Sequence, residues 1–228
     1  MGVVEPKLCG LGIDGRTWVG LHEVFRMRIW KIWRSSATGV GRSLKRLAWL
    51  LCVLTPLAAW FLVKPVRVVA PQLFGLACPS EVLCVDDPSQ AEVAMGLYAE
   101  AMRFVADTVT PIAGHPRLIF CSTASCAEAF GLGARSAVTV ANAGTVIGPR
   151  AWKPYYVRHE LIHYLQCERL GAVPLLFKPA WFVEGMAYGL SEDPRAPLVE
   201  PFEAYRRQFL GWYSSISPAN LWAAGRKL

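Results

Sequence analysis

His159-Glu160-Leu161-Ile162-His163 sets two histidines four residues apart around a glutamate. In an α-helix, residues four apart lie on the same face and one turn from each other, so both imidazoles can reach a single ion. Glu160 is rotated about 100° from His159, so its carboxylate can take a proton from a metal-bound water instead of ligating. The spacing predicts a zinc site that uses His159 and His163, with Glu160 as the general base.

Signals at both ends of this segment predict a helix from about Pro154 to Arg169. Pro154 suits the first helical turn, Gly171 follows the last apolar position, and Pro174 prevents continuation. The motif therefore falls inside a helix whose two ends are marked.

A catalytic zinc ion normally takes three protein ligands and keeps one position for water, so a third ligand is needed. Glu184 is the best candidate. It lies in a second apolar stretch, 179–188 (PAWFVEGMAY), which can form a helix after a short connection rich in Pro and Gly.

The two segments together resemble the gluzincin metallopeptidases, in which a Trp-Phe-x-Glu-Gly-x-Ala segment downstream of a His-Glu-x-x-His helix supplies a glutamate ligand. The resemblance covers residues 135–192 and is to the superfamily. It implies Zn²⁺ bound by His159, His163 and Glu184, and an α+β, zincin-like domain with a small sheet, an active-site helix and a following helix that carries the glutamate.

The chain departs from the gluzincin pattern at Tyr188, one turn beyond Glu184. Several gluzincin families have an acidic group there that supports a histidine ligand. The sequence therefore leaves the support of the histidines unassigned.

The positive charge of the chain is confined to its N-terminal part. The formal net charge is +7, of which residues 1–46 carry +6 and residues 47–70 carry +2, while residues 71–228 carry −1. Basic groups of a nucleic-acid-binding domain should cluster on one face of the folded part, so this distribution argues against a nucleic-acid partner.

The segment 47–63 contains no charged residue and predicts a transmembrane anchor. As a helix it is about 25 Å long, at the short end for crossing a bilayer, and Trp49 and Trp60 lie near its ends, where indoles favour the interface. Most flanking basic residues precede it, which predicts a cytoplasmic tail over residues 1–46. The domain at 71–228 is then extracytoplasmic, in the periplasm if the source is a Gram-negative bacterium.

Two alternatives for the apolar segment remain open. The segment could be a cleaved signal peptide, but no good small-x-small cleavage site follows it before Pro71. A buried core helix fits poorly with the charge asymmetry around the segment. The sequence also leaves open whether translation starts at Met1 or at Met27.

Four cysteines of the predicted outer domain suggest two disulfides, because such an even set at close spacing in an oxidising compartment usually pairs. The simplest pairing is Cys78 with Cys84 and Cys121 with Cys126, although three pairings are open. A structural zinc site is the rival, but the gaps of five and four residues fit it poorly. Cys167 lies a further helical turn beyond His163, about 6 Å along the axis, and is not expected to ligate.

Hydrophobic periodicity and turn composition predict the remaining elements of the domain. They are helices over Pro88–Val109, Ala124–Leu132 and Pro201–Trp212, and strands over Leu118–Cys121, Ala137–Ala141 and Thr145–Ile147. The last two strands form a hairpin before the metal helix. The resemblance makes the stretch 137–147 a candidate edge for binding an extended peptide, and an ordinary structural hairpin is the equal alternative.

These features favour a membrane-anchored zinc metallopeptidase that hydrolyses peptides or proteins at the extracytoplasmic face with a zinc-activated water. The alternative is a catalytically inactive envelope protein that keeps the fold as a binding or assembly module. The intact Glu160 favours the enzyme. A protease embedded in the bilayer is disfavoured, because Arg158, Glu168 and Arg169 flank the motif.

Several properties have no signal in the sequence. These are the substrate, the choice between endo- and exo-cleavage and the oligomeric state. The donor that stabilises the oxyanion is also unmarked, its candidates being Tyr188, Tyr205, Tyr213 and His115.

Overall fold

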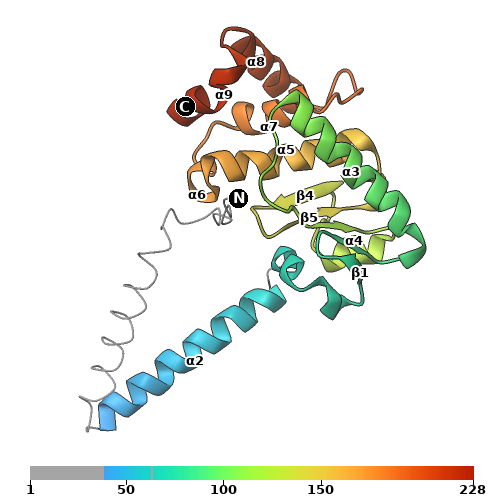
Figure 1. Ribbon diagram of the computed structural model, residues 1–228. Helices are drawn as coiled ribbons and strands as arrows, with labels where there is room; N and C mark the ends of the chain where they lie inside the picture. The colour runs from blue at the N-terminus through green and yellow to red at the C-terminus, as the bar shows by residue number, and fades with distance from the viewer. Residues whose placement is uncertain (1–38, 63) are drawn as a thin grey trace, which may run out of the picture. The chain divides into compact units, whose positions relative to one another are not determined.

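The computed structural model describes residues 39–62 and 64–228, which belong to two units divided after residue 63. The described part of the first unit is helix α2, Gly39–Leu62 (Figure 1). The predicted anchor over residues 47–63 falls on this helix except for residue 63, which lies outside the described residues, as does the predicted tail up to residue 38. In the described part of the chain, no helix is both long enough and apolar enough to cross a membrane.

The second unit is an α+β fold built on a five-stranded mixed sheet. Its strands are β1 Ala77–Ser80, β2 Leu83–Val85, β3 Leu118–Phe120, β4 Ala137–Val140 and β5 Gly144–Ile147, in the order β1-β2-β3-β5-β4. The three central strands, β2, β3 and β5, are parallel, whereas β1 and β4 run antiparallel to their neighbours. β4 is therefore an edge strand, and its one sheet partner is β5.

The central strands are short apolar runs because both faces of the sheet are covered. Every residue of β3 is fully buried, and alternate residues enter different clusters. Leu118 and Phe120 belong to the core that the sheet forms with α3 and α5, while Ile119 packs with Cys126 and Phe130 on the other face. One β-strand thus contributes to two hydrophobic cores.

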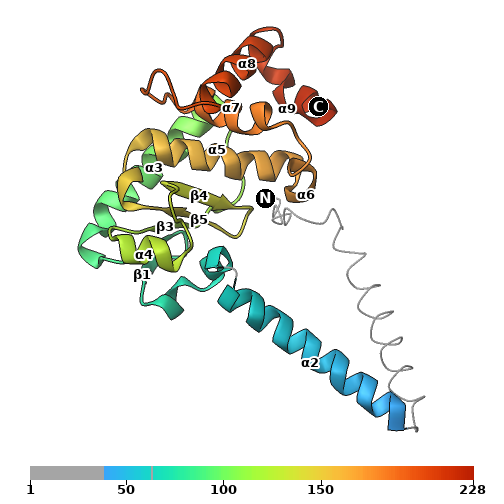
Figure 2. The same ribbon diagram turned by 180° about the vertical axis from the view of Figure 1, so that it is seen from behind.

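The helices form layers on the two faces of this sheet (Figures 1 and 2). α3 and α5 cover one face and α4 the other, and α7, α8 and α9 follow beyond α5. The α-helices are α3 Ala91–Thr108, α4 Ala124–Ala129, α5 Pro154–Leu170, α6 Ala172–Leu175, α7 Ala180–Leu190, α8 Phe202–Ser214 and α9 Leu221–Lys227. The 3₁₀ turns are η1 Lys64–Val69, η2 Pro71–Phe74, η3 Pro88–Gln90, η4 Pro149–Ala151 and η5 Pro218–Asn220.

The structure confirms the predicted helices and strands, with small changes at their ends. α3 begins after a 3₁₀ turn at 88–90, because Asp87 caps that turn through the Ser89 amide. α4 stops at Ala129, before the predicted Leu132, since Gly131 takes a positive φ of 75°. Strands β1 and β2 and helices α6 and α9 were not predicted.

Two disulfides occur in the described residues, and they are the simplest pairing expected from the spacing. Cys78–Cys84 joins β1 to β2, and Cys121–Cys126 joins the end of β3 to α4. Each closes a short local loop: the first links the edge strand β1 to β2, and the second links the end of the central strand β3 to α4.

A glycine sets the distance between α7 and α8. A methyl group at Gly185 would lie 2.3 Å from the Tyr205 carbonyl oxygen and 2.8 Å from Phe209 Cβ.

We predict that Gly185→Ala lowers the free energy of unfolding by about 1–3 kcal/mol, because the backbone of α8 must move. Gly96→Ala on α3 is the control. That site is open, so the helix propensity of Ala should raise stability by about 0.5–1 kcal/mol. Urea titration of both variants measures the difference, and equal shifts would contradict close packing at Gly185.

Candidate metal centre

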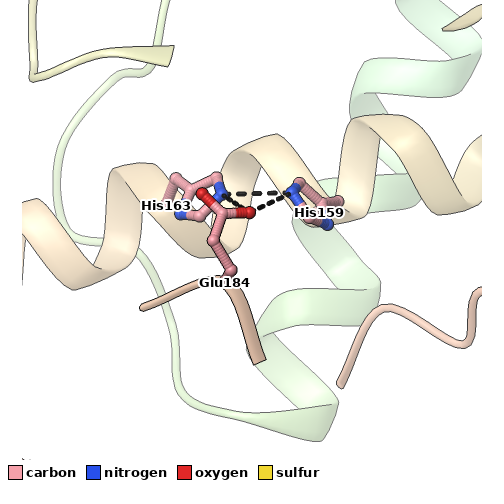
Figure 3. A group of neighbouring side chains, drawn as sticks. All are labelled: His159, His163 and Glu184. Carbon is pink, nitrogen blue, oxygen red and sulfur yellow. Dashed lines mark hydrogen bonds and ion pairs between the residues drawn. The ribbon is translucent and has the colours of Figure 1, made fainter. Parts of the chain in front are cut away.

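Helix α5 presents the two motif histidines side by side. It starts with Pro154 in its first turn and ends at Gly171, whose φ of 88° favours glycine. His159 Nε2 and His163 Nε2 lie 3.1 Å apart, and the His159 side chain is only 10% exposed. Both imidazole nitrogens therefore face one point in a largely buried site (Figure 3).

Glu184 reaches the same point from α7, as sequence analysis predicted. Its Oε2 lies 3.8 Å from His159 Nε2 and 3.7 Å from His163 Nε2. Figure 3 shows the carboxylate beside both rings, and its side chain is 33% exposed. Among the described residues these three form the group that could hold a metal ion.

The spacing of these atoms suits a tetrahedral ion. Ligand atoms about 2.0–2.2 Å from a tetrahedral zinc ion lie about 3.3–3.5 Å from one another. The three observed separations, 3.1, 3.7 and 3.8 Å, lie close to that range. Small side-chain movements would bring all three atoms to ligand distance.

The position of Glu184 follows from the packing of α7 between α5 and α8. Phe182 and Met186, on either side of Glu184 in the helix, are fully buried in the core. The Phe182 ring packs edge-on against Trp212 of α8, with ring centroids 5.5 Å apart. This anchoring fixes the rotation of α7 and so the direction of Glu184.

Gln166 supports His163, a role that the sequence analysis left unassigned. His163 Nδ1 donates to Gln166 Oε1 at 2.9 Å, and Gln166 Nε2 donates to the Val183 carbonyl oxygen at 2.9 Å. The amide therefore presents its oxygen to the histidine, which leaves Nε2 as the metal-facing nitrogen. The available signal was the position of Gln166, three residues beyond His163 on the same helix.

Thr139 of strand β4 contacts the predicted base. Its Oγ1 lies 2.6 Å from Glu160 Oε2 and donates to it. Burial raises the pKa of the Glu160 carboxyl, and the charge of His163 and the Thr139 hydrogen bond oppose this effect. The edge of the sheet thus lies beside the predicted general base.

The pKa values of the two histidines are shifted in opposite directions. Burial and the charge of His163 hold the pKa of His159 well below its usual value. Burial also acts to lower the pKa of His163, but the Glu184 and Glu160 carboxylates outweigh it and raise that pKa to about 9. Without a metal ion, His163 is therefore charged at neutral pH and His159 is neutral. The Nε2–H of His163 can then donate a hydrogen bond to Nε2 of His159.

Tyr188 packs against His159, with ring centroids 4.3 Å apart. Burial and the Glu184 charge raise its pKa to about 12, so it remains a neutral donor. The other candidate donors have different surroundings. Tyr205 packs against Phe202, Tyr213 stacks on Phe209, and His115 lies in an exposed loop. Of the four candidates, Tyr188 is the one whose ring contacts a histidine of the possible metal-binding group.

Cys167 lies on the same helix and is buried, and its thiol contacts the Asn142 side-chain oxygen. The metal-ligand group does not include it.

The fold and the site together define an α+β protein with a possible two-histidine, one-glutamate metal-binding group. Comparisons of this chain with protein-family models, with curated proteins and with solved structures found no match. The geometry and chemistry of the site are therefore the basis for inferring a function.

Removing the Gln166 side-chain amide should weaken metal binding without unfolding the protein. We expect Gln166→Leu to lower zinc affinity by about 10–100-fold, because His163 loses the partner that orients it. Competition with a chromophoric chelator measures this change. Gln208→Leu, at an exposed position of α8, is the control and should keep the affinity of the wild type. Equal affinities in the two variants would show that Gln166 does not position the ligand.

Zinc binding should release about one proton at pH 7.5, since the pKa of His163 is about 9 and its Nε2 must be deprotonated to ligate. The direction of the pH dependence follows from the raised pKa of His163. Below about pH 9 zinc must displace the His163 proton, and above it zinc need not. Zinc affinity should therefore rise by about tenfold per pH unit from neutrality to about pH 9. Calorimetry in buffers of different ionisation enthalpy measures the proton count. A count near zero would contradict a charged His163.

Proposed function

We propose that this protein is a zinc-dependent hydrolase of peptide bonds. One observation carries the proposal: His159, His163 and Glu184 converge from two helices, with Glu160 next to His159. Two histidines and a glutamate form a known three-ligand set for catalytic zinc, which leaves the fourth position for water or substrate.

Zinc bound by these residues supplies a Lewis acid that lowers the pKa of a water to about 7 and polarises a carbonyl group. Glu160 accepts the proton of the attacking water and delivers it to the leaving amine. Burial raises the pKa of the Glu160 carboxyl, which makes it a stronger base than an exposed glutamate. Thr139 holds one oxygen of the Glu160 carboxylate in position.

The edge strand β4 supports a peptide as substrate. Its sheet partner is β5, and Thr139 in the middle of the strand contacts the base. An extended peptide that added to the free side of β4 would run beside Glu160, as in strand-addition binding. This geometry favours peptides over small substrates without a backbone.

An extracytoplasmic location is part of the proposal. The support is the pair of disulfides, Cys78–Cys84 and Cys121–Cys126, since disulfides persist in oxidising compartments and are rare in the cytosol. Substrates would then be peptides or proteins of that compartment.

The zinc-loaded chain should cleave members of a fluorogenic peptide mixture, and Glu160→Gln should reduce cleavage by at least about 100-fold. The amide keeps the shape of the carboxylate but cannot accept the proton. Zinc content should stay that of the wild type, because Glu160 is not a ligand. Glu92→Gln, at an exposed position of α3, is the matched control and should remain active.

His163→Ala should lose both zinc and cleavage. Turnover like that of the wild type in Glu160→Gln would refute the assignment of the base. A zinc-loaded wild type that cleaves no peptide would favour the binding or assembly module instead.

A further inference from the structure

Arg195 lies close to the metal centre in the loop between α7 and α8, and the proposed reaction does not use it. Tyr188 connects the two: its ring centroid is 4.3 Å from that of His159 and 5.9 Å from the Arg195 guanidinium carbon. The guanidinium is therefore no more than about 10 Å from the His159 ring. An extended chain rises about 3.3 Å per residue, so a substrate residue within about three positions of the scissile bond could reach the guanidinium.

A buried carboxylate holds the guanidinium in place. Arg195 Nε donates to Asp193 Oδ1 at 2.9 Å, and Nη2 donates to Asp193 Oδ2. The Asp193 side chain is 1% exposed, whereas that of Arg195 is 39% exposed. Asp193 is thus buried while the Arg195 guanidinium is accessible, and the ion pair fixes the orientation of the guanidinium.

The guanidinium keeps donors for a ligand. Nη1 uses one N–H on the Tyr156 hydroxyl at 2.9 Å, and Asp193 takes the Nε proton and one of Nη2. Of the five N–H groups, one on each terminal nitrogen is left. Within the described part of the chain, no acceptor contacts these two groups. Each of these two N–H groups can donate to an oxygen of a bound carboxylate.

The loop that carries Arg195 is preorganised. Arg206 Nη1 donates to the Arg195 carbonyl oxygen at 3.0 Å, and the Leu198 amide donates to Glu203 at 3.0 Å. On the other side, Arg158 of α5 pairs with Glu192 at 3.1 Å. An anchored loop pays little ordering entropy when a ligand binds.

The surroundings favour a carboxylate ligand. The acids nearest in the loop have partners, because Asp193 pairs with Arg195 and Glu192 with Arg158. The rings of Tyr155 and Tyr156 lie 5.3 and 4.7 Å from the Arg195 guanidinium carbon and reduce its exposure to water. We propose that Arg195 binds a carboxylate of the substrate near the scissile bond, from an Asp or Glu side chain or from the chain terminus. This proposal rests on the hydrolysis proposed above.

Hydroxamates test the subsite without turnover, because the hydroxamate group binds zinc. The probes are the monohydroxamates of succinic, glutaric and adipic acids, each paired with the compound that has a carboxamide in place of the carboxylate. Calorimetry on the zinc-loaded full chain gives the dissociation constant of each. At one chain length at least, we expect the carboxylate to bind about tenfold more tightly than its amide.

Arg195→Gln should remove this preference and leave amide binding unchanged. Arg195→Lys should keep part of it, since ammonium supplies charge without the bidentate fork, and it serves if the Gln variant does not fold. Arg207→Gln is the matched control: it removes one positive charge from an exposed position of α8 and should keep the preference.

The outcomes separate the two proposals. A wild type that binds every hydroxamate but prefers no carboxylate, or an Arg195→Gln variant that keeps the preference, would overturn the role of Arg195 alone. If the wild type binds no zinc, or binds none of the hydroxamates, both proposals are overturned.

A second arm identifies the source of the carboxylate. Zinc-loaded Glu160→Gln is titrated with three short peptides: one with a free C-terminus and no acidic side chain, one amidated with a single Asp, and one amidated with neither. Tighter binding of the first or the second over the third assigns the carboxylate to the chain terminus or to the side chain. Equal affinities would overturn the recognition of a peptide carboxylate.

Discussion

The packing of α7 against α5 is the constraint on which the site depends. α5 alone provides two imidazoles and a base, and two ligands do not make a catalytic zinc site. Glu184 completes the set only because Phe182 and Met186 fix the rotation of α7, while Gly185 lets α8 approach from behind. The Val183 carbonyl of the same helix turn also accepts from Gln166. One helix contact therefore supplies the third member of the possible metal-binding group and orients His163.

Electrostatics explains why such a site can be stable without a metal ion. A histidine and two carboxylates lie together in a buried position, where an unpaired charge would be costly. His163 takes a proton and pairs with Glu184 at 3.7 Å, while His159 stays neutral. A divalent cation bound by these residues would replace that proton and balance the same carboxylates. The arrangement is thus prepared for metal at a modest cost in stability.

The sequence could predict the parts of the site whose signals are local. The spacing of His159 and His163 on a marked helix, and the apolar stretch around Glu184, were enough to find the three side chains of the possible metal-binding group. The cysteine spacing likewise gave the two observed disulfides. These features depend on residues a few positions apart, so periodicity and turn residues report them directly.

The supporting residues could not be found in the same way, because their partners are distant in the chain. Thr139 meets Glu160 only through the strand order, and Arg195 is placed near the centre by contacts with Tyr188 of α7 and Arg206 of α8. Strand β2 has three residues and no alternation, since both of its faces are buried, so its pattern is that of any short apolar run. Gln166 takes the supporting role from within α5, whereas the family pattern places the supporting group at position 188 of α7.

Zinc K-edge X-ray absorption of the zinc-loaded chain tests the central claim most directly, because it reports the ligands of the ion in solution. Nitrogen and oxygen scatterers at about 2.0–2.2 Å are expected, with the multiple scattering of two imidazoles and no sulfur shell. A sulfur shell at about 2.3 Å would place the ion at cysteines and contradict the assignment. An imidazole signal unchanged in His163→Ala would contradict it equally.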